Sequence, residues 1–156
     1  MVSMGDKIDV DAIHRQFGAE LFNHTWALIE KPARSAADDA EMVLSAMTSR
    51  WHWGRIGGPP QVITGDWQVA HVLALVGDAA LSLRFATRAL DGAIAAGFTG
   101  WRLASVHEGM ARAHAAAGDA AARAEHVAAA EAALAAETDA EDATVIADQL
   151  ASVPPA

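Results

Sequence analysis

Apolar residues recur every three to four positions along most of the chain, the spacing of an amphipathic helix. The clearest case is residues 100–118, where His107, Met110, Ala111 and His114 share one helical face. No segment shows the two-residue alternation of a β-strand over four or more positions. The pattern therefore predicts an all-α protein of about seven antiparallel helices. We expect one compact domain over residues 10–152, after a frayed N-terminus at residues 1–9.

Breaks in the pattern set the predicted helix bounds. Gly-Asp pairs at 77–78 and 118–119 each turn the chain. Lys31-Pro32 ends the first helix, because proline cannot continue one. The predicted helical segments span residues 10–30, 35–53, 64–75, 79–96, 99–117, 120–136 and 140–150.

The clearest break in the helical pattern separates the second and third predicted helices. Ser35 is expected to cap the second helix, with acidic residues in its first turn. Gly54 and then Gly57-Gly58-Pro59-Pro60 are expected to end it. We interpret this stretch as a loop within one domain, and Thr64 or Asp66 can cap the third helix.

The first helix has a wide apolar face, which predicts that it is buried over a broad surface. The residues that form this face are Ile13, Phe17, Leu21, Phe22, His24, Trp26, Leu28 and Ile29.

Composition narrows the function classes. The chain has 156 residues, a net charge of −9 and no cysteine. Binding to phosphate backbones or anionic membranes needs clustered Lys and Arg, so we expect neither nucleic acid nor membrane as a partner. No apolar run approaches the roughly 18 residues of a membrane span. The lack of cysteine fits a reducing compartment, and we expect a soluble, cytoplasmic protein.

The two Gly-Asp turns belong to similar helical hairpins. Each joins two helices, and small residues follow at helical spacing: Ser82, Ala86 and Ala89 after the first turn, and Ala130 after the second. This arrangement resembles the hairpin of the tetratricopeptide (TPR) superfamily over roughly residues 64–136. His107, Met110, Ala111 and His114 fall where TPR units carry packing residues. The glycines at 77 and 118 are 41 positions apart instead of about 34, and Arg123 replaces a small residue, so the array is irregular.

A second group of residues and motifs carries another resemblance, namely Phe22-Asn23, Trp26, Ser49-Arg50-Trp51-His52-Trp53, Gly65-Asp66-Trp67-Gln68, Glu108 and Ala111-Arg112-Ala113-His114. With them the chain resembles a family of short bacterial TPR-like proteins without an assigned activity. The resemblance associates a histidine with the position of Met47 and an arginine with that of Thr64, so a polar site of that family is expected to be altered here.

Histidines supply one set of candidate site residues. His52, His71, His107 and His114 lie on predicted helices near apolar faces, where imidazoles from facing helices can hold a divalent metal. However, no HExxH, ExxH or HxH spacing occurs, and His107 lies about 10 Å along the helix axis from His114. A metal site is therefore open but not favoured, and the alternative is that these histidines replace core aromatic residues. The cofactor is otherwise unknown.

Tryptophans supply a second set. Trp53, Trp67 and Trp101, with Arg50, His71 and His114, are candidates for a pocket lined by aromatic and polar groups. Indoles combine a large apolar face with one N–H donor, which suits planar or cationic ligands. The alternative is that they fill volume which alanine cannot.

Glu108 is the candidate with two opposed interpretations. It is four residues from Arg112, which is the spacing of an ordinary surface ion pair. If it faces a groove near a histidine, it is a candidate general base, together with His107 and His52 as catalytic candidates.

Two functions remain open at this point, and the sequence leaves it undecided whether the protein is an enzyme. The first is a helical domain whose groove, lined by His, Trp and Glu, binds a small ligand and could catalyse a reaction. The second is a non-enzymatic TPR-like scaffold that binds a protein or peptide. A homodimer is also open, because the small side chains of residues 120–136 favour close helix packing.

Overall fold

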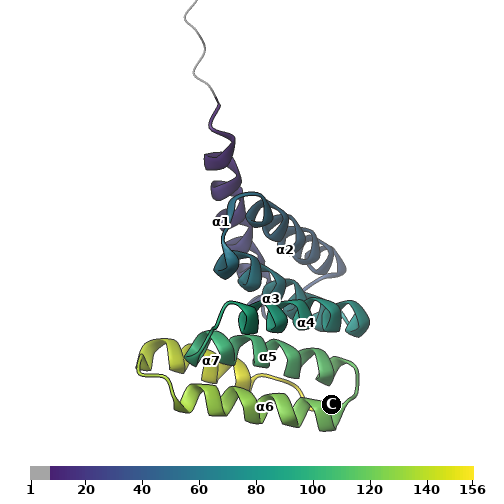
Figure 1. Ribbon diagram of the computed structural model, residues 1–156. Coiled ribbons are helices and arrows are strands. Elements are labelled where there is room, and N and C mark those ends of the chain that lie inside the picture. The colour runs from purple at the N-terminus through teal and green to yellow at the C-terminus, as the bar shows by residue number, and fades with distance from the viewer. Residues whose placement is uncertain (1–7) are drawn as a thin grey trace, which may run out of the picture.

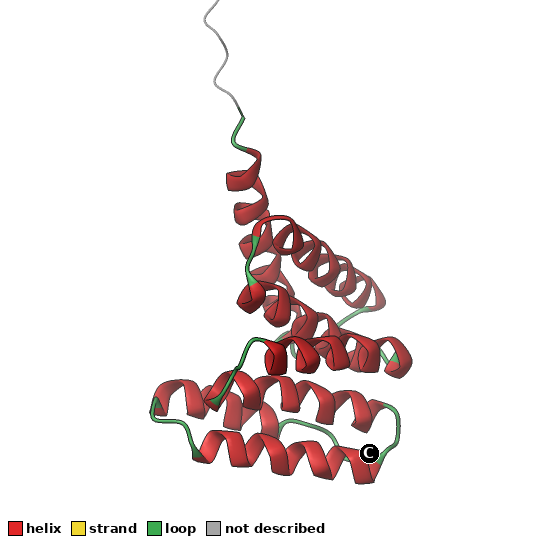
Figure 2. Cartoon of the chain, in the orientation of Figure 1, coloured by secondary structure: helices red, strands yellow, loops and turns green. Residues whose placement is uncertain are grey.

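The computed structural model describes residues 8–156, and that range is all-helical, without a strand (Figures 1 and 2). This confirms the predicted fold class and number of helices. The helices are α1 (Val10–Ile29), α2 (Ala36–Ile56), α3 (Pro59–Leu75), α4 (Ala79–Ala95), α5 (Gly100–Ala116), α6 (Ala120–Ala135) and α7 (Ala140–Ala151).

Three helical hairpins, α1–α2, α3–α4 and α5–α6, stack in chain order (Figure 1). Helix α2 contacts α3, and α4 contacts α5, so each hairpin leads directly into the next. Helix α3 also contacts α5, and α7 packs on α5 and α6 at the C-terminal end. Helices α3, α5 and α7 thus contact one another in turn, and side chains far apart in sequence meet between them.

The two Gly-Asp turns are built alike. Gly77 has a φ of 86° and Gly118 a φ of 74°, the left-handed conformation that favours glycine at the end of a helix. The carboxylates of Asp78 and Asp119 then cap the next helix, each accepting a hydrogen bond at 3.0 Å from a backbone N–H three residues later. Each dipeptide thus ends one helix and begins another.

The junction between α2 and α3 differs from the predicted loop. Ser35 caps α2 in a reciprocal pair with Asp38, as predicted. The helix then continues through Gly54 to Ile56, and α3 begins at Pro59 rather than at Thr64. A proline in the first turn sacrifices no hydrogen bond, because the N–H that it lacks would have no helical partner there. The prolines therefore start a helix here, and the prediction of a loop up to Thr64 is wrong.

Helix α1 is less buried than its apolar pattern predicts. Ile13 is 38% exposed and Phe17 is 44% exposed. Leu28 and Ile29, at the other end of α1, pack against the core formed with α2 and α3. The prediction of broad burial is therefore wrong for the N-terminal half, since α1 reaches beyond the stacked hairpins there (Figure 1).

Small residues occupy the contacts between helices. Ala86, Ala89 and Ala130 are almost completely buried, and the buried Ser82 hydroxyl donates a hydrogen bond to the backbone oxygen of Ala70 at 2.7 Å. Side chains this short let helix axes approach closely, so these residues allow α4 and α6 to pack closely on their partners.

Candidate functional site

Glu108 is fully buried between α3 and α5, and both of its carboxylate oxygens are engaged. Oε2 accepts a hydrogen bond from the indole Nε1 of Trp67 at 2.8 Å. Oε1 accepts from Nε of Arg112 at 2.8 Å and lies 2.6 Å from Nη2. A general base needs a lone pair within reach of a substrate proton. The geometry therefore favours a structural role for Glu108.

Arg112 extends this network to the C-terminal end of the chain. Its Nη2 atom donates to the backbone oxygen of Gln149 at 3.1 Å and to Oγ of Ser152 at 2.9 Å. Arg112 is only 4% exposed. The interpretation of Glu108 and Arg112 as a surface ion pair is wrong, because both side chains are buried. Charges buried this deeply are stable only when they are paired and hydrogen-bonded, as these two are.

His71 belongs to an aromatic cluster beside this network. Its ring centroid lies 5.5 Å from that of Trp26 and 6.3 Å from that of Trp67. Its Nδ1 atom is buried and has no hydrogen-bond partner among residues 8–156. Burial, with smaller effects of Arg112 and Arg34, lowers the pKa of His71 well below 6.5. His71 is therefore a neutral imidazole that packs as an aromatic ring.

His52 lies elsewhere, between α2 and the exposed half of α1. Its Nδ1 atom is 2.8 Å from Nδ1 of His14, a contact that requires one ring to donate an N–H and the other to accept it. Its ring also contacts those of Phe17 and Trp51. Burial first, and then the nearby His14, lower the pKa of His52.

His107 and His114 lie in a third place, against α6. Nδ1 of His107 is 3.0 Å from Nδ1 of His126, and the ring of His114 stacks on that of His126 with centroids 5.5 Å apart. Burial and then His126 lower the pKa of His107. The four candidate histidines thus lie in three separate groups, and in residues 8–156 no three potential ligands converge as a metal site requires.

Arg50 is held by an acidic residue of α3. Its Nε atom donates to Asp66 Oδ1 at 2.6 Å, and Arg88 approaches the other oxygen at 3.4 Å. Gly65 leaves room for the Arg50 side chain, because a Cβ there would lie 2.7 Å from Arg50 Cδ. The guanidinium of Arg50 therefore ties α2 to α3.

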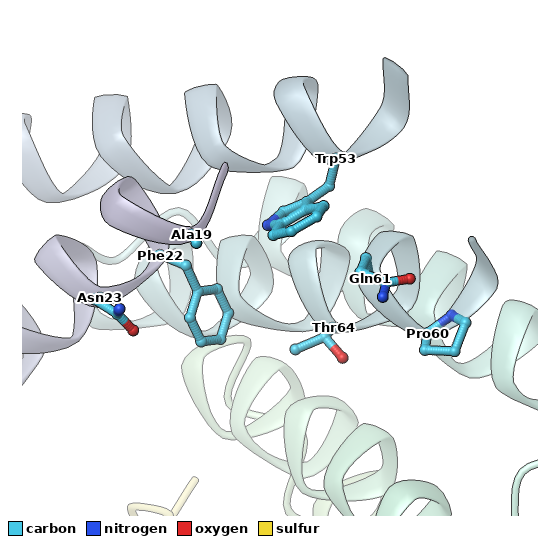
Figure 3. Close-up of a pocket in the computed structure, with 7 residues that line it drawn as sticks. All are labelled: Ala19, Phe22, Asn23, Trp53, Pro60, Gln61 and Thr64. Carbon is cyan, nitrogen blue, oxygen red and sulfur yellow. The ribbon is translucent and has the colours of Figure 1, made fainter. Parts of the chain in front are cut away.

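A surface hollow of about 280 Å³ opens between α1, the end of α2 and the start of α3 (Figure 3). We call it the first hollow. The ring of Phe22 and the indole of Trp53 project into it from different helices (Figure 3). The indole sits close to Gly18 of α1, where a Cβ would lie 2.8 Å from Trp53 Cε2. The lining consists of Ala19, Phe22, Asn23, Trp53, Pro60, Gln61 and Thr64.

A second, smaller hollow of about 90 Å³ lies between α3 and α5. The Arg102 guanidinium lies over the rings of Phe98 and Trp101, 5.4 Å from each centroid. Pro60 and Thr64 line both hollows, so the two adjoin along α3, and we call the pair, lined from α1, α2, α3 and α5, the trough. The lining of the second hollow is Pro60, Ile63, Thr64, Trp67, Phe98, Trp101, Arg102, Ser105 and Val106.

Three predicted candidates, Trp53, Trp67 and Trp101, line this trough. Asn23 and Gln61 also line it, and the sequence analysis did not select them as site residues. Single amides on helices have no distinctive spacing. Only their positions could have indicated a site. Gln61 follows the two prolines at the start of α3, and Asn23 is part of the Phe22-Asn23 pair that carries the family resemblance.

Comparisons with known proteins identify no relative. The chain matches no model of a known protein family, no curated protein and no solved structure. None of the helices in residues 8–156 combines the length and apolar character that a membrane crossing requires. The functional argument therefore depends on the trough and the groups around it.

Proposed function

We propose that the chain is a non-enzymatic helical-repeat domain whose trough binds an extended segment of a partner protein. The observation that carries this proposal is that the two hollows adjoin, with Pro60 and Thr64 lining both. Two adjoining hollows lined from four helices suit a chain-like ligand, because successive side chains can occupy successive hollows. The resemblance to TPR hairpins supports the same function by analogy of fold.

The acid–base groups support binding over catalysis. Glu108 gives both oxygens to Arg112 and Trp67, and His52 and His107 each pair with another histidine. Glu108, His52 and His107 do not line either hollow. The cytoplasm is the compartment we propose, on the absence of cysteine alone.

The size of the first hollow favours a second candidate, a small ligand bound there alone. Its volume of about 280 Å³ is close to the lower end of the range for small-molecule pockets, about 300–1,000 Å³. In that case the second hollow would contribute nothing to affinity. Variants of Trp101, which lines only the second hollow, separate the two candidates.

Selection from a random peptide library tests the proposal. Peptides enriched on the wild-type chain should lose binding to Thr64→Arg, because the long side chain fills the junction of the two hollows. They should keep binding to Thr48→Arg, a matched change at an exposed position of α2 outside both hollows. Trp101→Ala should weaken binding as well. Failure to enrich any peptide, or equal binding to both arginine variants, would contradict the proposal.

A further inference from the structure

We infer that the first hollow is an anchor site for an uncharged, planar aromatic group, such as the side chain of Trp, Tyr or Phe in the bound segment. This inference rests on the proposed function and adds the chemical class of the group recognised. It follows from three properties of the hollow, namely its aromatic walls, its uncharged lining and the fixed position of Trp53.

The walls select for a flat apolar group. Phe22 and Trp53 come from different helices and project into the hollow, with Pro60 at its edge (Figure 3). Aromatic rings gain energy from offset-stacked or edge-to-face contacts beyond the burial of their area. The volume of about 280 Å³ is small for a drug-sized ligand, which makes a single ring system the better match.

The lining selects against charge. The chain has 20 acidic and 11 basic residues, yet all seven residues around the first hollow are uncharged. The nearby guanidinium of Arg50 donates to Asp66. A charged group buried here would lose its water without gaining an ionic partner, which is costly. A cationic ligand, which tryptophan surfaces can otherwise attract, is therefore disfavoured in this hollow.

The polar groups present suit the backbone or polar edge of a neutral ligand. Asn23 and Thr64 are exposed at the hollow and can both donate and accept hydrogen bonds. The amide oxygen of Gln61 accepts a hydrogen bond from the backbone N–H of Gly58 at 3.1 Å, which orients that side chain. Neutral amide and hydroxyl groups complement peptide N–H and C=O groups without requiring a charge.

The indole of Trp53 packs closely against the backbone of Gly18 on α1. A Cβ at Gly18 would lie 2.8 Å from Trp53 Cε2 and 3.0 Å from its Nε1. The wall is thus positioned before a ligand arrives, which lowers the cost of ordering it on binding. Gly18 is a positioning residue on this argument, because its missing side chain makes space for the indole.

A series of matched probes tests the inference. N-acetyl-tryptophanamide is uncharged, N-acetyl-tryptophan is an anion and tryptophanamide is a cation, while N-acetyl-leucinamide is uncharged without a ring. Each is titrated at pH 6.5 into the 15N-labelled full-length chain, and binding is measured from the backbone amide signals of Asn23 and Thr64. We expect N-acetyl-tryptophanamide to bind with a Kd on the order of 1 mM and at least about tenfold more tightly than the other three.

Two variants control for the location of the probe. Gly18→Ala should weaken the binding of N-acetyl-tryptophanamide by displacing Trp53. Thr48→Arg should leave the affinity for this probe unchanged. Equal affinities across the charge series, or saturation by the leucine probe at the same concentration, would overturn the inference. So would the absence of binding by all four probes. The peptide selection tests peptide binding independently of these four probes. A failure of this inference can therefore be distinguished from a failure of the proposed function.

Discussion

Trp53 on α2 and Trp67 on α3 line adjoining hollows, but their surroundings are opposite. Trp67 is 7% exposed, and its indole Nε1 donates a hydrogen bond at 2.8 Å to the buried carboxylate of Glu108. Trp53 is half-buried at an open hollow whose lining carries no charge. One tryptophan thus belongs to a buried network that joins α3 to α5, and the other to the wall of an open surface hollow.

This difference separates polar groups that are buried with their partners from polar groups that are accessible beside a hollow. Glu108 was a candidate general base in the sequence, yet it pairs with Arg112, which in turn binds the end of α7. Neither Asn23 nor Thr64 was among the predicted site residues, yet both are exposed at the first hollow. Buried groups with every partner in place hold the fold together, whereas accessible neutral groups beside aromatic walls can meet a ligand.

The largest expected effect comes from breaking the buried network. Glu108→Ala leaves the guanidinium of Arg112 buried without its counter-ion and the indole N–H of Trp67 without an acceptor. We expect it to lower the free energy of unfolding by about 3–5 kcal/mol, measured by urea denaturation. Thr64→Arg, at the open hollow, should change stability by less than about 1 kcal/mol. Similar losses in the two variants would contradict the division between network and hollow.

A smaller effect is expected from crowding Trp67. In Gly109→Ala the new Cβ would lie 2.7 Å from Trp67 Cδ1, inside a packed interface. We expect a net loss of about 1–2 kcal/mol, because overpacking outweighs the higher helix propensity of alanine. Gly54→Ala is the control, since its Cβ would meet only the end of the flexible Arg50 side chain. A Gly109→Ala variant as stable as Gly54→Ala would show that Trp67 is not tightly held.

Acidification should weaken the fold through four histidines whose pKa is lowered in the folded protein. Burial is the first cause that lowers the pKa of His52, His71, His107 and His126 below 6.5 in the folded protein. The unfolded chain therefore takes up protons near pH 6.5 that the folded chain does not, and the free energy of unfolding falls as the pH drops through this value. Carboxylates such as Asp38, whose pKa is lowered to about 2, titrate at more acidic pH.

Urea denaturation at pH 7.5 and 5.5 measures this effect, and His71→Phe identifies part of its source. Phenylalanine keeps the ring contacts with Trp26 and Trp67, so at pH 7.5 we expect a change within about 1 kcal/mol. Between the two pH values the variant should lose less stability than the wild type. Stability that is unchanged or higher at pH 5.5 in the wild type would contradict this account.

Periodicity and turn chemistry predict most of the fold. The Gly-Asp pairs at 77–78 and 118–119 separate helices as expected, because the left-handed glycine and the capping aspartate are local features. The start of α3 at Pro59 was missed, since prolines can end one helix or begin the next. The exposure of Phe17 was missed because an apolar face does not reveal whether another helix covers it.

The site was harder to predict, because its contacts join distant positions. Trp67 and Glu108 are 41 residues apart, and His14 and His52 are 38 residues apart. Nothing in the local pattern indicates that such pairs form, so the histidines looked like one site although they lie in three groups. The first hollow combines residues of α1, α2 and α3, and its neutral lining is recognisable only after these helices are packed.

The most direct test of the account is the response of the indole N–H signals to a bound peptide. The chain has five tryptophans, and single Trp→Phe variants assign their signals in 15N-labelled protein. A library-selected peptide should shift the Trp53 signal at saturation and leave Trp67 hydrogen-bonded to Glu108, with at most a small change. A shift confined to Trp67, or a bound peptide that leaves Trp53 unchanged, would contradict the assignment of the trough as the binding site.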